Sequence, residues 1–210
     1  MKNWLAVIGF YLMGVASISG QTLHYDVIRN GESMGSTIVK RMRNGNQVTY
    51  HLSTKTEFRI LFLFKVEYDL QETFENGVLV NGKGYNTLNG SVQKETKMQK
   101  KTNGYELIID GITTEVSERG IKESVSEIYF EEPYDDKPVY SAYFARYMNF
   151  DKLGDHQYSL TSPDGTNVYT YENGICTEVK VSRDFASFTF FLKPESLAAV
   201  RSKKIIGSND

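Results

Sequence analysis

Apolar and polar side chains alternate most clearly between residues 62 and 71. One set is apolar and consists of Phe62, Phe64, Val66, Tyr68 and Leu70. The set interleaved with it is polar and includes Lys65, Glu67, Asp69 and Gln71. A period of two is typical of a β-strand that buries one face and exposes the other. Shorter runs of the same kind occur at residues 48–52 and 188–192, so the pattern predicts half-buried strands along the chain.

Asn-Gly and Asp-Gly dipeptides separate many of these runs. Two-residue hairpin turns need positive φ angles, which Asn, Asp and Gly adopt at the lowest steric cost. The nine dipeptides are Asn30-Gly31, Asn44-Gly45, Asn76-Gly77, Asn81-Gly82, Asn89-Gly90, Asn103-Gly104, Asp110-Gly111, Asp164-Gly165 and Asn173-Gly174. Their spacing predicts strands that turn back on themselves in an antiparallel meander.

The segments between the turns predict about a dozen strands and no long helix. They are Thr22–Ile28, Ser33–Met42, Gln47–Phe58, Leu61–Phe74, Val78–Tyr85, Val92–Lys100, Tyr105–Ile109, Ile112–Ser117, Tyr158–Leu160, Asn167–Tyr171, Ile175–Arg183 and Ser187–Lys193. A chain of 210 residues fits one domain of this kind. We therefore expect an all-β fold, a single antiparallel meander that forms an open β-roll or half-barrel.

The turn signals stop between Gly111 and Asp164. Residues 118–155 contain two of the four prolines, Pro133 and Pro138, and an acidic stretch at 131–136. We expect this segment to cross from one edge of the sheet to another, with a short helix at 142–148. A closed up-and-down barrel does not need such a break, so the gap favours an open roll with a lid or plug. Any function is expected where the turn signals stop.

The first twenty residues have the order of a secretory signal peptide. Lys2 precedes an apolar stretch at 4–15 and small residues at 16–20. An uncleaved anchor is the alternative, but the apolar stretch is shorter than the roughly 20 residues that span a bilayer. We expect residues 1–20 to be removed, a β-roll domain at 21–194 and a C-terminal tail at 195–210 that begins as a short helix. No cysteine lies near the expected cleavage point, so we expect an exported protein, periplasmic or secreted, without a lipid anchor.

Composition excludes some functions and supports a large core. Apolar residues make up 40% of the chain, with 14 Tyr and 12 Phe that bury a large area each. The net charge is −2 and the basic residues are scattered, with the densest patch at 94–101 interrupted by Glu95. Nucleic-acid binding needs a concentrated basic surface, so it is not expected. Cys176 is the single cysteine and is expected to be a buried core residue.

Catalytic and metal motifs fail in their context. Residues 31–35 fit the G-x-S-x-G pattern of α/β hydrolases around Ser33, but they follow a hairpin turn and precede strand-like residues. His24, His51 and His156 match no metal spacing. The acidic stretch at 131–136 could bind Ca²⁺, yet it lacks EF-hand spacing and is better explained as a solvated turn. We therefore expect no enzyme activity, no metal and no cofactor.

Glu72 continues the inward register of the strand at 61–74. An inward carboxylate must be paired, hydrogen-bonded or near a cavity mouth, because an unpaired buried charge is costly. A bulge or a rim position would turn it outward. The alternative is a polar group in the floor of a binding groove, and the groove residues that we then expect are Phe62, Phe64, Tyr68 and Glu72.

Several stretches carry a family resemblance. Residues 128–133, 139–141 and 162–176 resemble short exported bacterial proteins with a domain of unknown function. In the N-terminal half, residues 25–27, Gly35 and the stretch from Phe64 through Glu72 to Leu79 are similar to the same family and to a broader one. The resemblance implies an open, spiral β-roll, distantly similar to half-barrels that carry lipoproteins across the periplasm. It implies no catalytic residue and no ligand.

Two functions follow as hypotheses. The first is a non-enzymatic exported domain that binds an apolar or lipid-like small molecule, because ligand sites are usually concave and mostly apolar. The second is a cell-envelope protein-interaction module that uses a sheet edge or the acidic crossover, since β-augmentation needs only unpaired backbone groups. A hydrolase and an outer-membrane barrel are weaker, because the serine motif fails and stretches such as 93–103 are too polar for a lipid-facing band.

Overall fold

The computed structural model describes residues 18–118, 120–133, 137–183 and 186–206. Its strands are β1 (Ile18–Arg29), β2 (Glu32–Asn44), β3 (Gln47–Arg59), β4 (Leu63–Glu75), β5 (Val78–Leu88), β6 (Ser91–Lys101), β7 (Gly104–Ile109), β8 (Ile112–Val116), β9 (Val139–Ser141), β10 (Arg146–Met148), β11 (Phe150–Gly154), β12 (Gln157–Ser162), β13 (Gly165–Glu172), β14 (Ile175–Ser182) and β15 (Ser187–Leu192). The helical elements are the 3₁₀ turn η1 (Glu127–Tyr129) and the helix α1 (Pro194–Ile206). Residues 1–17 of the expected signal peptide lie outside the described residues, and 18–20 belong to β1.

One antiparallel sheet of 13 strands forms most of the molecule. Its order is β11-β12-β13-β14-β15-β1-β2-β3-β4-β5-β6-β7-β8. The first strand pairs with the last, with Tyr25 opposite Leu192, so β1 and β15 meet in the middle of the sheet. The sheet does not close on itself, and within the described residues β8 and β11 form its two edges. The all-β meander expected from the sequence is confirmed.

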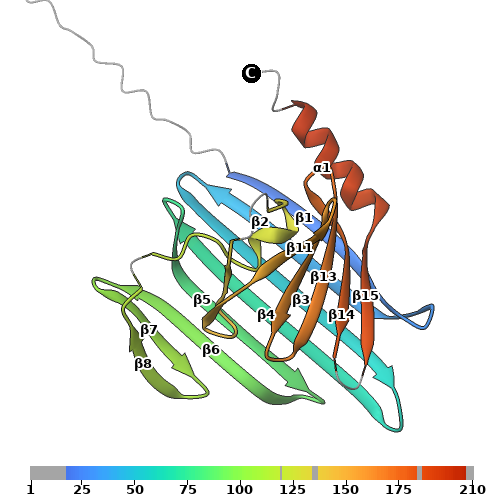
Figure 1. Ribbon diagram of the computed structural model, residues 1–210, viewed down its shortest axis with the longest axis horizontal. Helices are drawn as coiled ribbons and strands as arrows, with labels where there is room; N and C mark the ends of the chain where they lie inside the picture. The colour runs from blue at the N-terminus through green and yellow to red at the C-terminus, as the bar shows by residue number, and fades with distance from the viewer. Residues whose placement is uncertain (1–17, 119, 134–136, 184–185, 207–210) are drawn as a thin grey trace, which may run out of the picture.

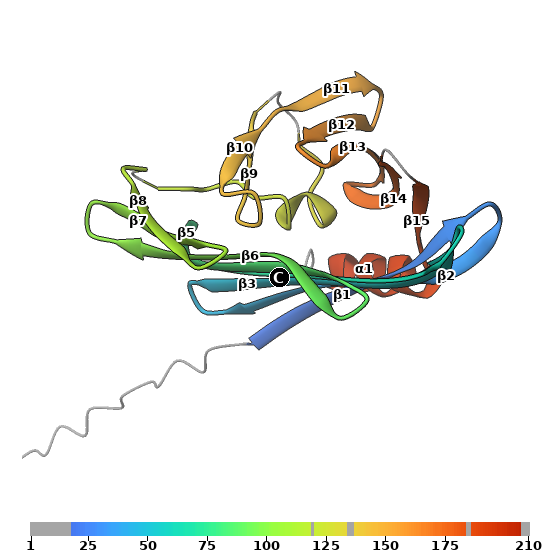
Figure 2. The same cartoon turned by 90° about the horizontal axis from the view of Figure 1, so that it is seen from below.

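The segment between β8 and β11 crosses over one face of the sheet. Figure 2 shows η1 lying between the long strands and the short strands β11 to β13. Its side chains form much of the core and include Ile121, Ile128, Phe130, Tyr140 and Ala142, each at most 4% exposed. The prediction of a helix at 142–148 is wrong. In its place β10 pairs with β9 in a small hairpin, with Tyr147 opposite Tyr140. The crossover is therefore a plug that fills the inner face of the sheet.

Inward-facing side chains of both halves of the sheet complete the core around this plug. Tyr25 and Leu70 are fully buried, and Tyr105 is 1% exposed. Buried tyrosines still need partners for their hydroxyls. The Tyr25 hydroxyl donates to the Cys176 carbonyl at 2.8 Å. The Tyr105 hydroxyl donates to the Leu79 carbonyl at 2.8 Å and accepts from the Ile121 amide at 3.2 Å, which ties the crossover to the sheet.

Five of the nine predicted turns have positive φ at both residues. They are Asn30-Gly31, Asn76-Gly77, Asn89-Gly90, Asp110-Gly111 and Asn173-Gly174. The prediction of a turn at Asn81-Gly82 is wrong, because both residues lie inside β5. Gly82 instead lets the crossover approach, since a Cβ there would stand 2.8 Å from the Ala142 Cβ.

The C-terminal tail forms α1 beside β1 (Figure 1). Lys193 donates its amide to the His24 carbonyl at 2.8 Å, and the His24 amide donates to Ser196 Oγ at 3.0 Å. Val200 is 6% exposed, so the helix packs on the domain. No helix in the described part of the chain is long and apolar enough to cross a membrane.

Candidate ligand cavity

A cavity of about 660 Å³ lies between the sheet and the crossover. Its walls come from strands far apart in the sequence, β3 and β4 on one side and β12 to β15 on the other, with β9 and β10 between them. Drug-sized ligands occupy pockets of about 300–1,000 Å³. The space is therefore large enough for a small organic molecule.

Most of the cavity wall is apolar. The apolar lining side chains include Val27, Leu52, Phe58, Val66, Leu70, Met148, Leu160, Val181, Phe188 and Phe190. Phe58 packs edge-on against Phe188 with ring centroids 5.0 Å apart, so the two halves of the sheet touch across the space. The alternation of the strands explains this wall, because every second residue points inward.

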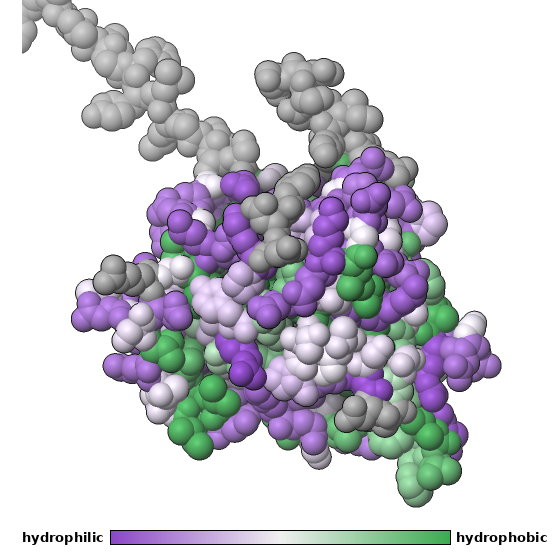
Figure 3. Space-filling view, viewed as in Figure 1, coloured by the Kyte–Doolittle hydropathy of each residue, from purple (hydrophilic) through white to green (hydrophobic). Residues whose placement is uncertain are grey.

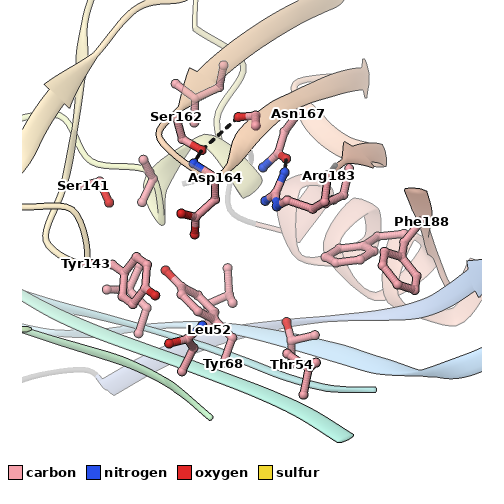
Figure 4. Close-up of a pocket in the computed structure, with 18 of the residues that line it drawn as sticks. Leu52, Thr54, Tyr68, Ser141, Tyr143, Ser162, Asp164, Asn167, Arg183 and Phe188 are labelled. Atoms are coloured by element: carbon pink, nitrogen blue, oxygen red, sulfur yellow. Dashed lines mark hydrogen bonds between the residues drawn. The ribbon is translucent and has the colours of Figure 1, made fainter. Parts of the chain in front are cut away.

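Polar groups gather where the cavity reaches the surface. They are carried by the turn between β12 and β13 and by the end of β14, and comprise Ser162, Asp164, Asn167 and Arg183. Asn167 Oδ1 accepts from Arg183 Nη1 at 2.9 Å, and the Ser182 carbonyl accepts from the same nitrogen at 2.8 Å. Figure 4 shows the Asp164 carboxylate directed into the space above Tyr68 and Tyr143. The mouth thus carries both a carboxylate and a guanidinium.

Two tyrosines stand between the apolar wall and the mouth. Tyr68 of β4 and Tyr143 of the β9–β10 turn are packed edge to face, with centroids 5.1 Å apart. Burial raises the pKa of Tyr68 well above 10.0, with smaller contributions from the charge of Glu72 and from Tyr143. Burial also raises the pKa of Tyr143. Both phenols are therefore neutral hydrogen-bond donors at physiological pH.

Asn86 contributes a further polar atom to the lining. Its Oδ1 is buried and has no hydrogen-bond partner within the described residues. A buried acceptor without a partner is costly, so a donor from a bound molecule would satisfy it.

The four groove residues expected from the sequence do not lie together. Only Tyr68 lines the cavity. Phe62 is 73% exposed at the tip of the β3–β4 hairpin, and Phe64 stacks on Phe58 with centroids 5.5 Å apart. Glu72 is fully buried but lies two residues beyond Leu70, the last lining residue of β4, and is not part of the lining. The wall that the strand does contribute is Val66, Tyr68 and Leu70.

Glu72 faces inward beneath the crossover. The bulge that could have turned it outward does occur nearby, but the extra residue is Val80 of β5 and Glu72 keeps its register. Burial raises its pKa above 4.5, while the Ser126 and Ser124 hydroxyls and the Ala142 and Ser126 amides oppose the shift. None of these contacts has hydrogen-bond geometry, and both carboxylate oxygens are buried without a formed bond in the described part of the chain.

A second group of polar residues closes the opposite end of the fold. Burial, followed by the charge of Glu131, raises the pKa of Glu127 to about 7. The Tyr50 hydroxyl donates to Glu127 at 3.4 Å, and Arg41 pairs with Glu131. Arg41 also lies over the Phe130 ring at 4.9 Å. These contacts hold the plug against β2 and β3, away from the cavity.

The remaining sequence candidates have structural roles. Ser33 lies exposed on β2 directly after a hairpin turn, as its context indicated. Cys176 is fully buried, and burial raises its pKa, so it is an unreactive core thiol. Among the described residues no three His, Cys, Asp or Glu side chains gather closely enough to hold a metal ion. Residues 134–136 of the acidic stretch lie outside the residues that the structure describes.

The polar residues at the cavity mouth are not predicted from the sequence. The sequence pattern marks Asp164 only as a turn residue and Arg183 only as the end of a strand, and it places Tyr143 in a helix that does not form. The order of the strands could have indicated these residues. Turns that follow every second strand meet at one end of a meander, so Asp164 and Arg183 belong to the same end as Phe58 and Val66.

Comparisons with known proteins agree with an all-β domain of this size. The family profile of DUF6134, a domain of unknown function, matches residues 25–193. A crystal structure of a beta-barrel-like protein of the domain of unknown function DUF1849, from Brucella abortus, superimposes with a TM-score of 0.57 at 8% identity and covers 85% of this chain and 98% of that one. This likeness concerns the fold alone. A comparison with curated proteins gives no match.

Proposed function

Since the chain belongs to the DUF6134 family, a domain of unknown function, we propose its function from the cavity itself. We propose that the protein is a non-enzymatic carrier or sensor of an apolar small molecule with a polar head, such as a lipid-like chain. The sheet acts as an open roll or half-barrel, and the crossover is the plug that shapes its interior. The observation that carries this proposal is the cavity of about 660 Å³ with apolar walls and a polar mouth.

The arrangement of the lining supports an amphipathic ligand. An apolar chain would contact Leu52, Val66 and Phe190, while a head group would meet Asp164 and Arg183 at the mouth. The Asn86 oxygen and the neutral hydroxyls of Tyr68 and Tyr143 would fix its orientation, as few convergent polar groups do in apolar pockets. The Ser162 hydroxyl beside Asp164 donates to the Gly165 carbonyl at 2.9 Å and not to a carboxylate, so it is not activated as a nucleophile, which favours binding over catalysis.

The proposed site of action is outside the cytoplasm, in the periplasm or secreted. This part rests on the sequence of residues 1–20, with its single Lys2, its short apolar stretch and its small residues before Gln21. A buried, unpaired Cys176 is compatible with an oxidising compartment, because one shielded thiol does not form disulfides.

A protein-interaction role at a sheet edge has less support. The edges of the 13-stranded sheet, as far as the structure describes it, are β8 and β11, each five residues long. Short edge strands with charged side chains, here Glu115, Asp151 and Lys152, are the usual protection against unwanted strand pairing. The cavity is therefore the stronger candidate.

Native mass spectrometry of the purified protein tests the proposal. We expect a mass increment from a co-purified apolar molecule, released by organic extraction and identified by tandem mass spectrometry. Protein that is free of any adduct, and that stays so after incubation with fatty acids and phospholipids, would contradict the proposed binding.

A further inference from the structure

The tip of the β3–β4 hairpin exposes four consecutive apolar side chains. Ile60 is 43% exposed, Leu61 82%, Phe62 73% and Leu63 37%. The other large exposed apolar side chains of the described chain are not consecutive in the sequence, for example Leu153 at 56%. Figure 3 shows the tip as a green area at the lower right of the molecule. Single exposed apolar residues are ordinary, whereas a contiguous group marks an interaction site.

The turn itself does not require these residues. Neighbouring hairpins turn with polar pairs such as Asn30-Gly31 and Asn89-Gly90, whose positive φ angles fit a tight turn. Residues 60–62 connect β3 and β4 through a bend without Asn, Asp or Gly. The apolar character of the tip therefore has no explanation in local folding.

The tip projects from the end of the sheet at which the cavity opens. Phe58 and Val66, on either side of the tip, line the cavity from the same hairpin. The polar mouth, with Asp164 and Arg183, lies at this end as well. Figure 1 shows the β3–β4 hairpin extending beyond its neighbours there.

We propose that the tip at residues 60–63 inserts into the surface of a lipid bilayer and holds the cavity mouth against it. The convex tip has too few residues for a stable protein interface, which buries about 800 Å² on each partner. Peripheral membrane proteins bury apolar groups about 5–10 Å deep in the interface of a bilayer, and attraction to anionic lipids adds to the binding. Exposed Arg59 flanks the tip where it would meet head groups, as does Lys65, which is paired with Glu57 at 3.0 Å. Leu61 and Phe62 are of the apolar types that peripheral proteins bury in the interface.

This docking names a source for the ligand: an apolar molecule taken from, or delivered to, the membrane that the tip contacts. The transfer rests on the proposed function of the cavity. The docking does not, because the exposed tip is independent of whether the cavity is filled.

Vesicle flotation with the purified protein tests the docking. The vesicles are phosphatidylethanolamine mixed with phosphatidylglycerol, and phosphatidylcholine alone. We expect the wild type to float with the mixed vesicles. The vesicle-bound fraction of the double variant Leu61→Asp, Phe62→Asp should be lower than that of the wild type by about tenfold or more. Leu153→Asp is the matched control, since it alters an exposed apolar residue at the other end of the strands and should float like the wild type.

Two further measurements separate the possible outcomes. A wild type that stays in solution, or a double variant that floats equally well, overturns the docking. A wild-type dimer by light scattering that the double variant converts to monomer, with no flotation of either, assigns the tip to a second copy of the chain and also overturns it. A cavity variant, Val66→Trp, should float normally while losing ligand, so failure of the cavity and failure of the tip give different results.

Discussion

At the scale of single residues, the least expected feature is a fully buried glutamate on the inner face of a strand. Glu72 takes the place of an apolar side chain between Leu70 and Phe74, and Ser124 and Ser126 of the crossover face it. The sequence predicts its inward direction, because alternation continues through it. Its surroundings could not be predicted, because they come from a segment about fifty residues further along the chain.

Replacing this carboxyl with its neutral isostere should stabilise the protein at neutral pH. Because burial raises the folded-state pKa of Glu72, the unfolded chain ionises first as the pH rises. The contribution of Glu72 to the free energy of unfolding is then highest below the unfolded pKa near 4.5. It falls by about 1.4 kcal/mol for each pH unit between the unfolded and the folded pKa. Urea unfolding of Glu72→Gln at pH 4 and pH 7 should show a gain only at pH 7. Glu75→Gln, on the exposed face of β4, is the control, and an equal change in both variants would contradict this account.

Glu127 should make docking of the plug sensitive to pH in the neutral range. Its pKa rises from 4.5 to about 7, so the stabilisation from its protonated form is full below pH 4.5 and is lost as the pH rises to about 7. We expect Glu127→Gln to flatten the stability profile between pH 5 and 8, with a gain of up to about 3 kcal/mol at the upper end. Carbon-detected NMR titration of the side chain measures the pKa directly. A midpoint near 4.5 would show that the carboxyl is not shielded as described.

At the scale of elements, the crossover and β5 fit each other through glycine. Gly82 and Gly84 place no side chain between β5 and the β9–β10 hairpin; added Cβ atoms would stand 2.8 Å from Ala142 and 3.1 Å from Tyr143. The Thr96 hydroxyl donates to the Tyr143 carbonyl at 2.9 Å and fixes the same contact from β6. The sequence predicts a turn at Asn81-Gly82, because an Asn-Gly dipeptide looks the same whether it forms a hairpin turn or, as here, lies inside a strand.

Substitution of Gly82 by valine should therefore displace the hairpin. Overpacking of this kind costs about 1–3 kcal/mol, which thermal unfolding detects readily. Because Tyr143 belongs to the displaced hairpin, ligand affinity should fall as well. Gly154→Ala is the control, because nothing lies within 4 Å of the added methyl group. Equal melting temperatures for Gly82→Val and the wild type would mean that the crossover does not pack here.

At the scale of the whole molecule, local patterns predict the strands better than their arrangement. All twelve strands expected from turns and alternation form, because each needs only its own sequence and its neighbour. The short strands β9, β10 and β11 are missed, since their pairing depends on the plug. The polar mouth is not predicted for a related reason. The strongest alternation lies in β4 and draws attention to that strand, whereas the mouth residues come from β12 to β14. Phe58 packs against Phe188, which lies 130 residues further along the chain, and no local pattern encodes that contact.

The central claim is that the space between sheet and plug holds an apolar ligand. Fluorescence titration with an apolar naphthylamine probe, compared between Val66→Trp and Glu67→Trp, tests it most directly. The two positions are adjacent on β4, but Val66 lines the cavity and Glu67 is exposed on the other face. We predict saturable binding to the wild type and to Glu67→Trp, and at least about a tenfold weaker affinity in the filled Val66→Trp variant. Equal binding by both variants, or no saturable binding to the wild type, would contradict the account.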